Sequence, residues 1–307
     1  MAKAALLFPG QGAQFVGMGR DFCEASPAAR ETFEQANAAL GFRLSDICFN
    51  GDAERLNDTS ICQPAILVMS IAVLRAVREK MGDGALLWEA AAGLSLGEYT
   101  ALVAAGALDF VDAVRLVHKR GSFMQAAAVE RPGSMASVIG LSDDVVEAVC
   151  AQARAKGVVV AANLNCPGQV VISGEKAAVE AACALAQEKG ARMAVPLKVS
   201  GAFHSPLMQP AQVKLAAELD ATKFATAKIP VVSNVSGEYM REPDDVRSAL
   251  KRQVTSAVLW HRSIQRLIAD GFDAFYEVGP GKVLTGLMKR IDKTKRAVNI
   301  NTTQYEL

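Results

Sequence analysis

The sequence predicts an α/β fold in which a large domain carries a smaller, inserted one. Three observations support this prediction. An apolar run that ends at Gly93 leads through a tight turn into a helical pattern. Apolar runs and helix-period segments alternate along the rest of the chain. Between residues 134 and 198 this alternation becomes shorter and more regular. With 307 residues, 51% of them hydrophobic, the chain is long enough for one large domain with a small insertion.

The tight turn at residues 93–97 follows G-x-S-x-G, the nucleophile-elbow pattern. In this pattern the serine occupies a sharp strand-to-helix reversal, so its Oγ projects from the backbone. Gly93 and Gly97 have no Cβ, which lets strand and helix approach closely. The following helix points its first N–H groups towards the serine and favours negative charge there. Ser95 is therefore the candidate nucleophile.

The large domain is expected over residues 1–127 and 199–307, and its serine elbow predicts an α/β-hydrolase-like arrangement. Expected strands cover 4–8, the apolar run from Leu87 to the elbow, 229–234, 272–278 and 297–300. Expected helices cover 28–39, 65–80 (with Pro64 preceding the helix), 96–105, 110–125, 212–219, 244–253 and 263–270.

The small domain is expected over residues 128–198. Its pattern predicts strands at 135–139, 158–163, 170–173 and 191–197 and helices at 142–155 and 176–188. The resulting order, β-α-β-β-α-β, is that of a ferredoxin-like unit. Because it separates two halves of the larger pattern, we expect an insertion.

Net charge, cysteine spacing and the length of the apolar runs argue against several kinds of partner and site. The formal net charge is +1, which gives no reason to expect nucleic acid or a membrane as partner. The six cysteines include no C-x-x-C pair, so reduced thiols are favoured over disulfides, and no metal site is expected. No apolar stretch is long enough for a signal-peptide core or a bilayer span. A cytoplasmic monomer is expected.

The glycine-rich loop after the first strand begins at Pro9 and contains Gly10 and Gly12. It lacks the G-K-[ST] of a phosphate-binding loop and does not match G-x-G-x-x-G. A backbone turn that presents N–H groups, such as an oxyanion-hole loop, is the better interpretation.

A serine hydroxyl needs a base, and the chain has only three histidines. His118 lies within a predicted helix and His261 at the start of another, whereas His204 lies in a loop of small and turn-forming residues. The order Ser95 before His204 matches α/β-hydrolase chains, but spacing alone does not decide between the three. A hydrolase triad also needs an acid, and no pattern singles one out from Asp109, Asp112, Asp143 and Asp144.

Arg120 is the other candidate in this region, because Gly121 follows it in a predicted helix. A guanidinium in a pocket can bind a substrate carboxylate through two parallel hydrogen bonds. A solvated or salt-bridged arginine is the alternative.

Six segments, found in order along the whole chain, together resemble the malonyl-CoA:acyl carrier protein transacylases of bacterial fatty-acid synthesis, members of the acyltransferase family. The segments are PGQGAQ (9–14), GLSLGE (93–98), RGSFMQ (120–125), NCPGQVVISG (165–174), AFHS (202–205) and EVGPG (277–281). Each segment alone has low or moderate specificity, whereas six in the family order are a strong signal.

The resemblance implies a malonyltransferase that uses malonyl-CoA as substrate, acyl carrier protein as partner and no bound cofactor. Ser95 would carry the malonyl group, and His204 would act as base and acid. The remaining residues implied are the backbone N–H groups of Gln11 and Leu96 for the oxyanion, Gln253 for orienting the histidine through its main-chain carbonyl, and Arg120, Met124, Asn165 and Phe203 for binding substrate.

One position departs from the family, which commonly has histidine where this chain has Leu94. A leucine there makes the pocket less polar. The basic run 289–296 is a candidate docking site for an acidic carrier protein, or simply a solvated helix end. A stand-alone acyltransferase of a polyketide synthase, a serine hydrolase acting on acyl thioesters and a non-catalytic acyl-CoA-binding protein are the alternative functions.

Overall fold

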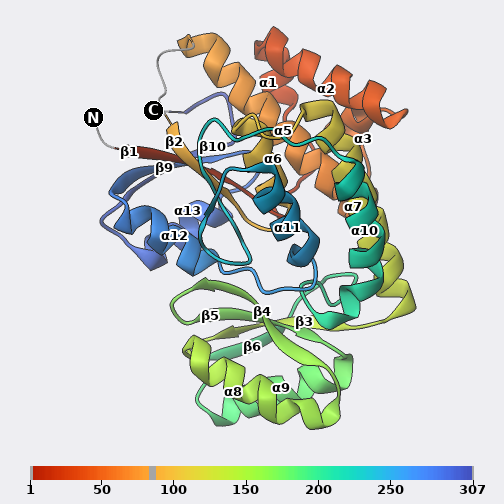
Figure 1. The fold of residues 1–307 in the computed structure, drawn as a ribbon, viewed down its shortest axis with the longest axis vertical. Coiled ribbons are helices and arrows are strands. Elements are labelled where there is room, and N and C mark those ends of the chain that lie inside the picture. Colours follow the sequence, from red (N-terminus) through yellow and green to blue (C-terminus); the bar gives the residue numbers. More distant parts are fainter. Residues whose placement is uncertain (1–2, 83–87, 306–307) are drawn as a thin grey trace.

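The computed structural model describes residues 3–82 and 88–305. Figure 1 shows a large part, built around one twisted sheet with helices on both faces, above a smaller part with its own sheet. The α/β class predicted from the sequence is confirmed. The chain enters the small sheet at β3 (Ser134–Ile139) and leaves it after β6 (Met193–Pro196). The exact domain boundaries at 128 and 198 stay a prediction.

The large sheet has the strand order β10-β9-β1-β2-β7-β8. The first five strands of this order pair in parallel, and β8 runs antiparallel to β7. The strands are β1 (Lys3–Phe8), β2 (Trp88–Gly93), β7 (Val231–Val232), β8 (Tyr239–Met240), β9 (Phe272–Val278) and β10 (Arg296–Ile300). Because β1 and β2 pair in parallel, the loop after β1 and the elbow after β2 emerge at the same edge.

The central strands are buried on both faces. Along β1, Ala5 and Leu7 pack against α12 (Trp260–Ala269) and α13 (Val283–Ile291), whereas Leu6 and Phe8 join the core on the opposite face. Alternate residues of a strand point to opposite faces, so a parallel sheet covered on both sides needs continuous apolar runs. This explains why the sequence of β1 is apolar throughout its buried part.

The other face is covered mainly by long helices, of which α5 (Thr59–Met81) is the most buried. The remaining helices of the large part are α1 (Arg20–Ala25), α2 (Pro27–Leu40), α3 (Leu44–Asn50), α4 (Ala53–Asn57), α6 (Leu96–Ala104), α7 (Phe110–Glu130), α10 (Gln209–Ala221) and α11 (Pro243–Gln253). Short η2 (Pro206–Met208) precedes α10.

The prediction that α5 begins after Pro64 is wrong, because the helix begins at Thr59 and contains the proline. Proline has no N–H, so the carbonyl of Ser60, four residues earlier, loses its usual intrahelical donor. His118 of α7 replaces that donor, since its Nδ1 lies 2.8 Å from the Ser60 oxygen. The contact gives His118 a packing role and joins α5 to α7.

The small sheet is antiparallel, with the order β4-β5-β3-β6, and α8 and α9 pack against it. Its other elements are α8 (Asp143–Ala153), η1 (Arg154–Lys156), β4 (Val159–Cys166), β5 (Gln169–Gly174) and α9 (Lys176–Glu188). The element order along the chain is the predicted β-α-β-β-α-β.

Other differences from the predicted elements concern short segments. The strand expected over 229–234 is reduced to β7, and that expected over 191–197 to β6. Helices α1, α3 and α4 and strand β8 were not predicted, because each is too short to show a clear hydrophobic period. Leu87, the expected start of the strand before the elbow, lies outside the described residues.

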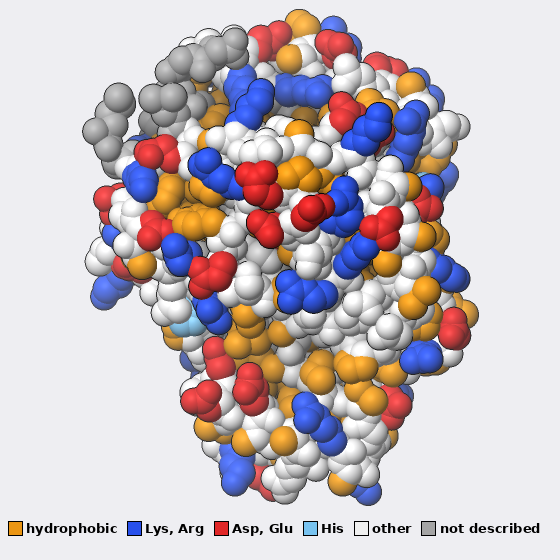
Figure 2. Space-filling model, viewed as in Figure 1, with side chains coloured by type: hydrophobic (Ala, Val, Ile, Leu, Met, Phe, Trp, Pro, Cys, Tyr) orange, Lys and Arg blue, Asp and Glu red, His pale blue; other side chains and the backbone are white. Residues whose placement is uncertain are grey.

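The surface charge and the buried helix α5 bear on nucleic acid and membranes as partners. Lys, Arg, Asp and Glu are interspersed over the face seen in Figure 2, without one large field of a single sign.

Helix α5 is long and apolar enough to cross a membrane. This corrects the prediction from the sequence that no apolar segment is long enough to do so. However, 83% of its most apolar window is buried inside the protein, as in a core helix.

Gly121 sets the distance between α5 and α7, because a Cβ at this position would lie 2.3 Å from the Thr59 carbonyl oxygen. Gly121→Ala is expected to lower the free energy of unfolding by about 1–3 kcal/mol through overpacking, despite the better helix propensity of alanine. Urea unfolding measures the change. Gly286→Ala on α13 is the matched control: no atom lies near its Cβ position, so it should gain up to about 1 kcal/mol. Equal effects of the two substitutions would contradict the close-approach argument.

Candidate active site

The elbow holds Ser95 in a strained backbone conformation between β2 and α6. Its φ of 52° and ψ of −100° lie in a region that side-chain-bearing residues rarely adopt, at a cost of about 1–3 kcal/mol. The two glycines of the motif make the turn possible. A Cβ on Gly93 would lie 1.9 Å from the Gly97 carbonyl oxygen, and one on Gly97 would lie 2.2 Å from that of Phe8.

Ser95 and His204 form a hydrogen-bonded pair, with Oγ 2.8 Å from Nε2. The other ring nitrogen, Nδ1, faces two main-chain carbonyl oxygens, at 3.0 Å from Gln253 and 3.2 Å from Ser256. Carbonyl oxygens only accept hydrogen bonds, so Nδ1 carries the proton and Nε2 is free to accept the serine proton. His204 also has a positive φ, of 57°, the other such non-glycine value in the described chain.

Among the described residues no carboxylate contacts Nδ1 of this histidine, so the geometry is that of a dyad supported by carbonyls. Of the acids considered from the sequence, Asp109 accepts the first N–H groups of α7, and Asp112 lies in that helix's first turn. Asp143 and Asp144 lie in the first turn of α8 in the small sheet's layer. The structure thus places all four away from Nδ1.

Arg120 reaches the same serine oxygen from α7. Its side chain is 1% exposed, so a solvated arginine is excluded. Nη2 donates to Ser95 Oγ at 3.0 Å and to Gln253 Oε1 at 2.8 Å, and Nη1 donates to Gln63 Oε1 at 2.7 Å. The Tyr99 ring lies beside the guanidinium, with Cζ 5.3 Å from the ring centroid. All of these partners are neutral groups.

Burial and the nearby cation make the histidine a weakly basic imidazole. Burial first, and the positive charge of Arg120 second, lower the pKa of His204 to about 4, against the opposing effect of the Gln253 and Ser256 carbonyls. Burial also lowers the pKa of Arg120, but a guanidinium stays protonated in proteins. The resting pair is therefore a neutral hydroxyl and a neutral imidazole beside a fixed positive charge.

The loop after β1 lies against the elbow. Leu94 donates its N–H to the Phe8 carbonyl at 3.0 Å, and a Cβ on Gly10 would lie 2.5 Å from the Leu94 carbonyl oxygen. Gln11 in this loop donates weakly to Thr59 Oγ1 at 3.4 Å, and Leu96 is the first residue of α6. The two backbone groups expected to bind an oxyanion thus belong to the loop after β1 and to the start of α6.

The comparisons with known proteins identify the family of this chain. The family model described as an acyl transferase domain matches residues 5–304. Malonyl CoA-acyl carrier protein transacylases of Bacillus subtilis (strain 168) and Escherichia coli (strain K12) are each 47% identical to this chain. The matches cover 98% of this chain and 94% and 96% of the two relatives. The chain belongs to the acyl transferase family. The resemblance drawn from the six sequence segments is confirmed.

Solved structures of related acyl transferases have the same fold. An acyl-carrier-protein S-malonyltransferase from Burkholderia pseudomallei 1710b superposes with a TM-score of 0.93 at 44% identity, covering 98% of this chain and 96% of that one. A malonyl-transacylase in complex with a type II PKS acyl-carrier protein gives a TM-score of 0.95 at 41% identity, covering 98% and 97%.

The other residues expected to bind substrate differ in how they are connected to Ser95, His204 and Arg120. Met124 is buried on α7, and its Sδ accepts from Gln63 Nε2 at 3.5 Å, which connects it to Arg120. Phe203 is buried directly before His204. Asn165, near the end of β4, is 8% exposed, and within the described part of the chain no hydrogen bond joins it to Ser95 or Arg120. Leu94 packs against the core on the α12 and α13 face.

Sequence reasoning missed four residues that hold the site together: Gln63, Glu98, Asn234 and Ser256. Asn234 follows β7 at the edge of the sheet where the elbow emerges, a position that favours site residues in parallel sheets. Glu98 belongs to the elbow segment itself. No sequence signal marks Gln63 or Ser256, because each acts on a residue that is distant in the chain.

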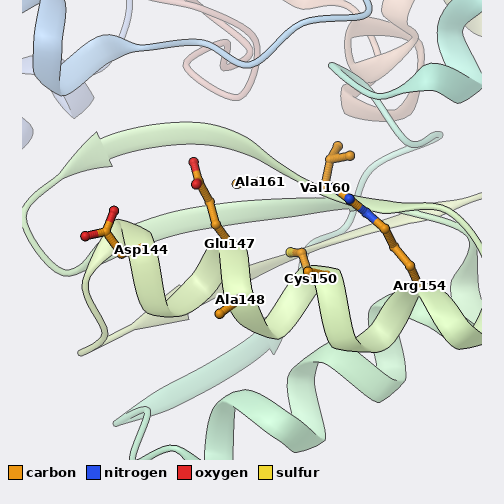
Figure 3. A pocket seen from close by; sticks show the side chains of 8 residues that line it. Asp144, Glu147, Ala148, Cys150, Arg154, Val160 and Ala161 are labelled. Carbon is orange, nitrogen blue, oxygen red and sulfur yellow. The ribbon is translucent and has the colours of Figure 1, made fainter.

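A surface hollow in the small part of the molecule lies away from this site. It encloses about 500 Å³ beside α8 and β4 of the small sheet, and Figure 3 shows Glu147, Cys150, Arg154 and Val160 among its lining side chains. It contains neither Ser95 nor His204. The basic run 289–296 is also partly engaged, since Lys295 pairs with Asp273 at 2.5 Å and Arg290 donates to Gln169.

The buried dyad leads to a prediction about titration. The imidazole of His204 should titrate near pH 4 in an NMR pH series of the free protein, against about 6.5 for an exposed histidine. Arg120→Leu should raise this pKa, because it removes the positive charge that disfavours the imidazolium. A value near 6.5 in the wild type, or no change in the variant, would contradict the structure's account of the site.

Proposed function

We propose that this acyl transferase moves a malonyl group from malonyl-CoA to the phosphopantetheine thiol of acyl carrier protein, through a malonyl-Ser95 intermediate. One observation carries the proposal. The Ser95 Oγ lies 2.8 Å from His204 Nε2 and 3.0 Å from Arg120 Nη2, so a base and a cation meet at one nucleophile. The names of the relatives, malonyl CoA-acyl carrier protein transacylases, agree with it.

In the first half-reaction, Ser95 Oγ attacks the thioester carbonyl while His204 Nε2 takes its proton. The negative charge that develops on the carbonyl oxygen is stabilised by the backbone N–H groups of Gln11 and Leu96. Each such donor typically contributes about 3 kcal/mol to the transition state. The C–S bond then breaks, and the coenzyme A sulfur leaves with the proton from His204.

The second half-reaction reverses these roles with a different thiol. His204 takes the proton of the phosphopantetheine thiol, the sulfur attacks malonyl-Ser95, and Ser95 Oγ recovers the proton as it leaves. The two half-reactions share one site, which makes the mechanism ping-pong. No bound cofactor is needed for either step, because the malonyl group enters as a thioester and is then carried as an ester of Ser95.

Arg120 provides selectivity for malonyl over acetyl groups. In the free enzyme its guanidinium donates to neutral acceptors on Gln63, Gln253 and Ser95. A malonyl carboxylate would replace a neutral partner with a charged one, which gives a stronger hydrogen bond in a dry site. A serine hydrolase of acyl thioesters would have no use for this buried cation. Met124, Phe203 and Asn165 are proposed to line the acyl site.

The partner and location follow from the same reaction. Acyl carrier protein is the proposed acceptor, and the enzyme is proposed to work in the cytoplasm as a monomer. A polyketide-synthase carrier protein is the second candidate acceptor, because a solved relative is in complex with a type II PKS acyl-carrier protein. Transfer assays with the two kinds of carrier protein distinguish them.

Intact-protein mass spectrometry after brief exposure to malonyl-CoA tests the proposed function directly. A malonyl adduct is expected on the wild type, lost on addition of carrier protein with its phosphopantetheine arm. Ser95→Ala should form none, because it lacks the attacking oxygen. Release of free malonate without carrier protein would instead indicate a hydrolase.

Substitution of Arg120 tests the selectivity for malonyl over acetyl groups. Arg120→Ala is expected to lower kcat/KM for malonyl-CoA by at least about a hundredfold, because a buried carboxylate would be left unpaired. Acetyl transfer should stay or increase, since acetyl-CoA has no carboxylate to pair. Competition assays with the two thioesters measure the ratio. If both activities fall equally, Arg120 has only a structural role.

A further inference from the structure

Glu98 is a buried carboxylate for which the mechanism above has no use. It lies in the first turn of α6, three residues after Ser95, and is 0% exposed. Within residues 3–82 and 88–305, the other fully buried carboxylate is Glu277, which accepts the N–H groups of Leu284 and Thr285 at the start of α13. Glu277 thus completes a helix terminus, whereas Glu98 faces the residues that hold Ser95.

Both oxygens of Glu98 accept hydrogen bonds from donors. Oε1 accepts the main-chain N–H of Asn234 at 3.1 Å, and Oε2 accepts from Nε2 of Gln253. An ionised carboxylate can accept both bonds, whereas a protonated one would turn a hydroxyl hydrogen towards a donor. The hydrogen-bond pattern therefore fits the charged form.

Gln253 links Glu98 to three other groups of the site: the Ser95 carbonyl, Arg120 and His204. Its Nε2 also donates to the main-chain oxygen of Ser95 at 2.9 Å, so the NH₂ group faces two acceptors. The amide oxygen is then turned towards Arg120, whose Nη2 donates to it at 2.8 Å. The main-chain carbonyl of Gln253 accepts from His204 Nδ1. Glu98 and the Ser95 carbonyl together fix which end of the Gln253 amide meets the guanidinium.

Asn234, the other donor to Glu98, holds the strained elbow. Its Oδ1 accepts the N–H of Ser95 at 2.6 Å, and its Nδ2 donates to the Gly93 carbonyl at 2.7 Å. Glu98 is thus the acceptor shared by the residue that fixes the elbow backbone and the residue that fixes Arg120.

We propose that the Glu98 carboxylate is a positioning residue that sets malonyl selectivity, by holding the Gln253 amide with its oxygen towards Arg120. This inference rests on the proposed malonyl transfer. Without the carboxylate, the Gln253 NH₂ group keeps only the Ser95 carbonyl as an acceptor, so the amide is held less firmly, and a turned amide would set NH₂ against the guanidinium. Arg120 would then lose its place beside Ser95 Oγ. Malonyl transfer depends on that place, and acetyl transfer depends on it less.

The ionisation of Glu98 gives a readout that a merely structural residue would lack. Burial raises the pKa of Glu98 to about 7, while Gln253, Asn234 and the charge of Arg120 oppose the rise. The other titratable side chains around Arg120 and Glu98 in the described chain are Tyr99, His204 and Cys62, and burial raises the pKa of Tyr99 and of Cys62 to about 12. None of the three titrates between pH 5 and 8. Protonation of Glu98 below about pH 7 should therefore reduce malonyl selectivity in the wild type.

Glu98→Gln and the matched control Glu89→Gln, an exposed position on β2, test the proposal through kcat/KM for malonyl- and acetyl-CoA between pH 5 and 8. For the wild type and Glu89→Gln, the malonyl-to-acetyl ratio should fall as the pH decreases through about 7. Glu98→Gln should lose about tenfold or more in malonyl kcat/KM at pH 8, lose less in acetyl kcat/KM, and show a ratio that does not change with pH. Thermal unfolding verifies that each variant is folded.

Two results would overturn the proposal. One is a wild-type ratio that stays constant between pH 5 and 8, which needs no variant to fold. The other is a folded Glu98→Gln enzyme whose two activities fall equally or remain at the wild-type level. Absence of malonyl-Ser95 in the wild type would instead contradict the proposed function itself, so the two failures are distinguishable.

Discussion

The buried guanidinium of Arg120 is the constraint on which the rest of this site depends. A cation with 1% exposure depends on the protein for its hydrogen bonds, and here Gln63, Gln253 and Ser95 accept from its two terminal nitrogens, while Nε has no partner among the described residues. All three are neutral, so no carboxylate is bonded directly to the guanidinium, and Glu98 is linked to it only through Gln253. The same charge helps to hold the imidazole of His204 neutral and able to accept a proton. Selectivity and nucleophile activation thus arise from one buried charge.

Placing that charge requires unusually close packing around α7. Gly121 allows α7 to approach the start of α5, and His118 donates to the Ser60 carbonyl that Pro64 leaves without a donor. Gln63, which holds the guanidinium, lies on this same turn of α5. The first turn of α5, interrupted by Pro64, therefore helps to position the site. In a regular helix the Ser60 carbonyl would accept an intrahelical N–H, and His118 would find no free acceptor there.

The backbone strain at Ser95 is supported in a similar way. Asn234 binds the chain on both sides of the elbow, and Gln253 binds the serine carbonyl. Strained conformations persist where surrounding contacts over-determine them, and Glu98 links these two supports. Local conformation, charge placement and hydrogen bonding thus form one connected network behind the nucleophile.

The sequence by itself determined the α/β class, the elbow at Ser95 and the order of the small sheet's elements, because these follow from local periodicity and from glycines that permit a tight turn. From the residues alone it left His204 undecided among three histidines and offered a solvated Arg120 as an alternative. Only the tertiary structure decided these points, and only it revealed Asn234 and Glu98 as supports. Hydrogen bonds between residues more than a hundred positions apart have no period or spacing in the sequence, so they become visible only when the chain is folded.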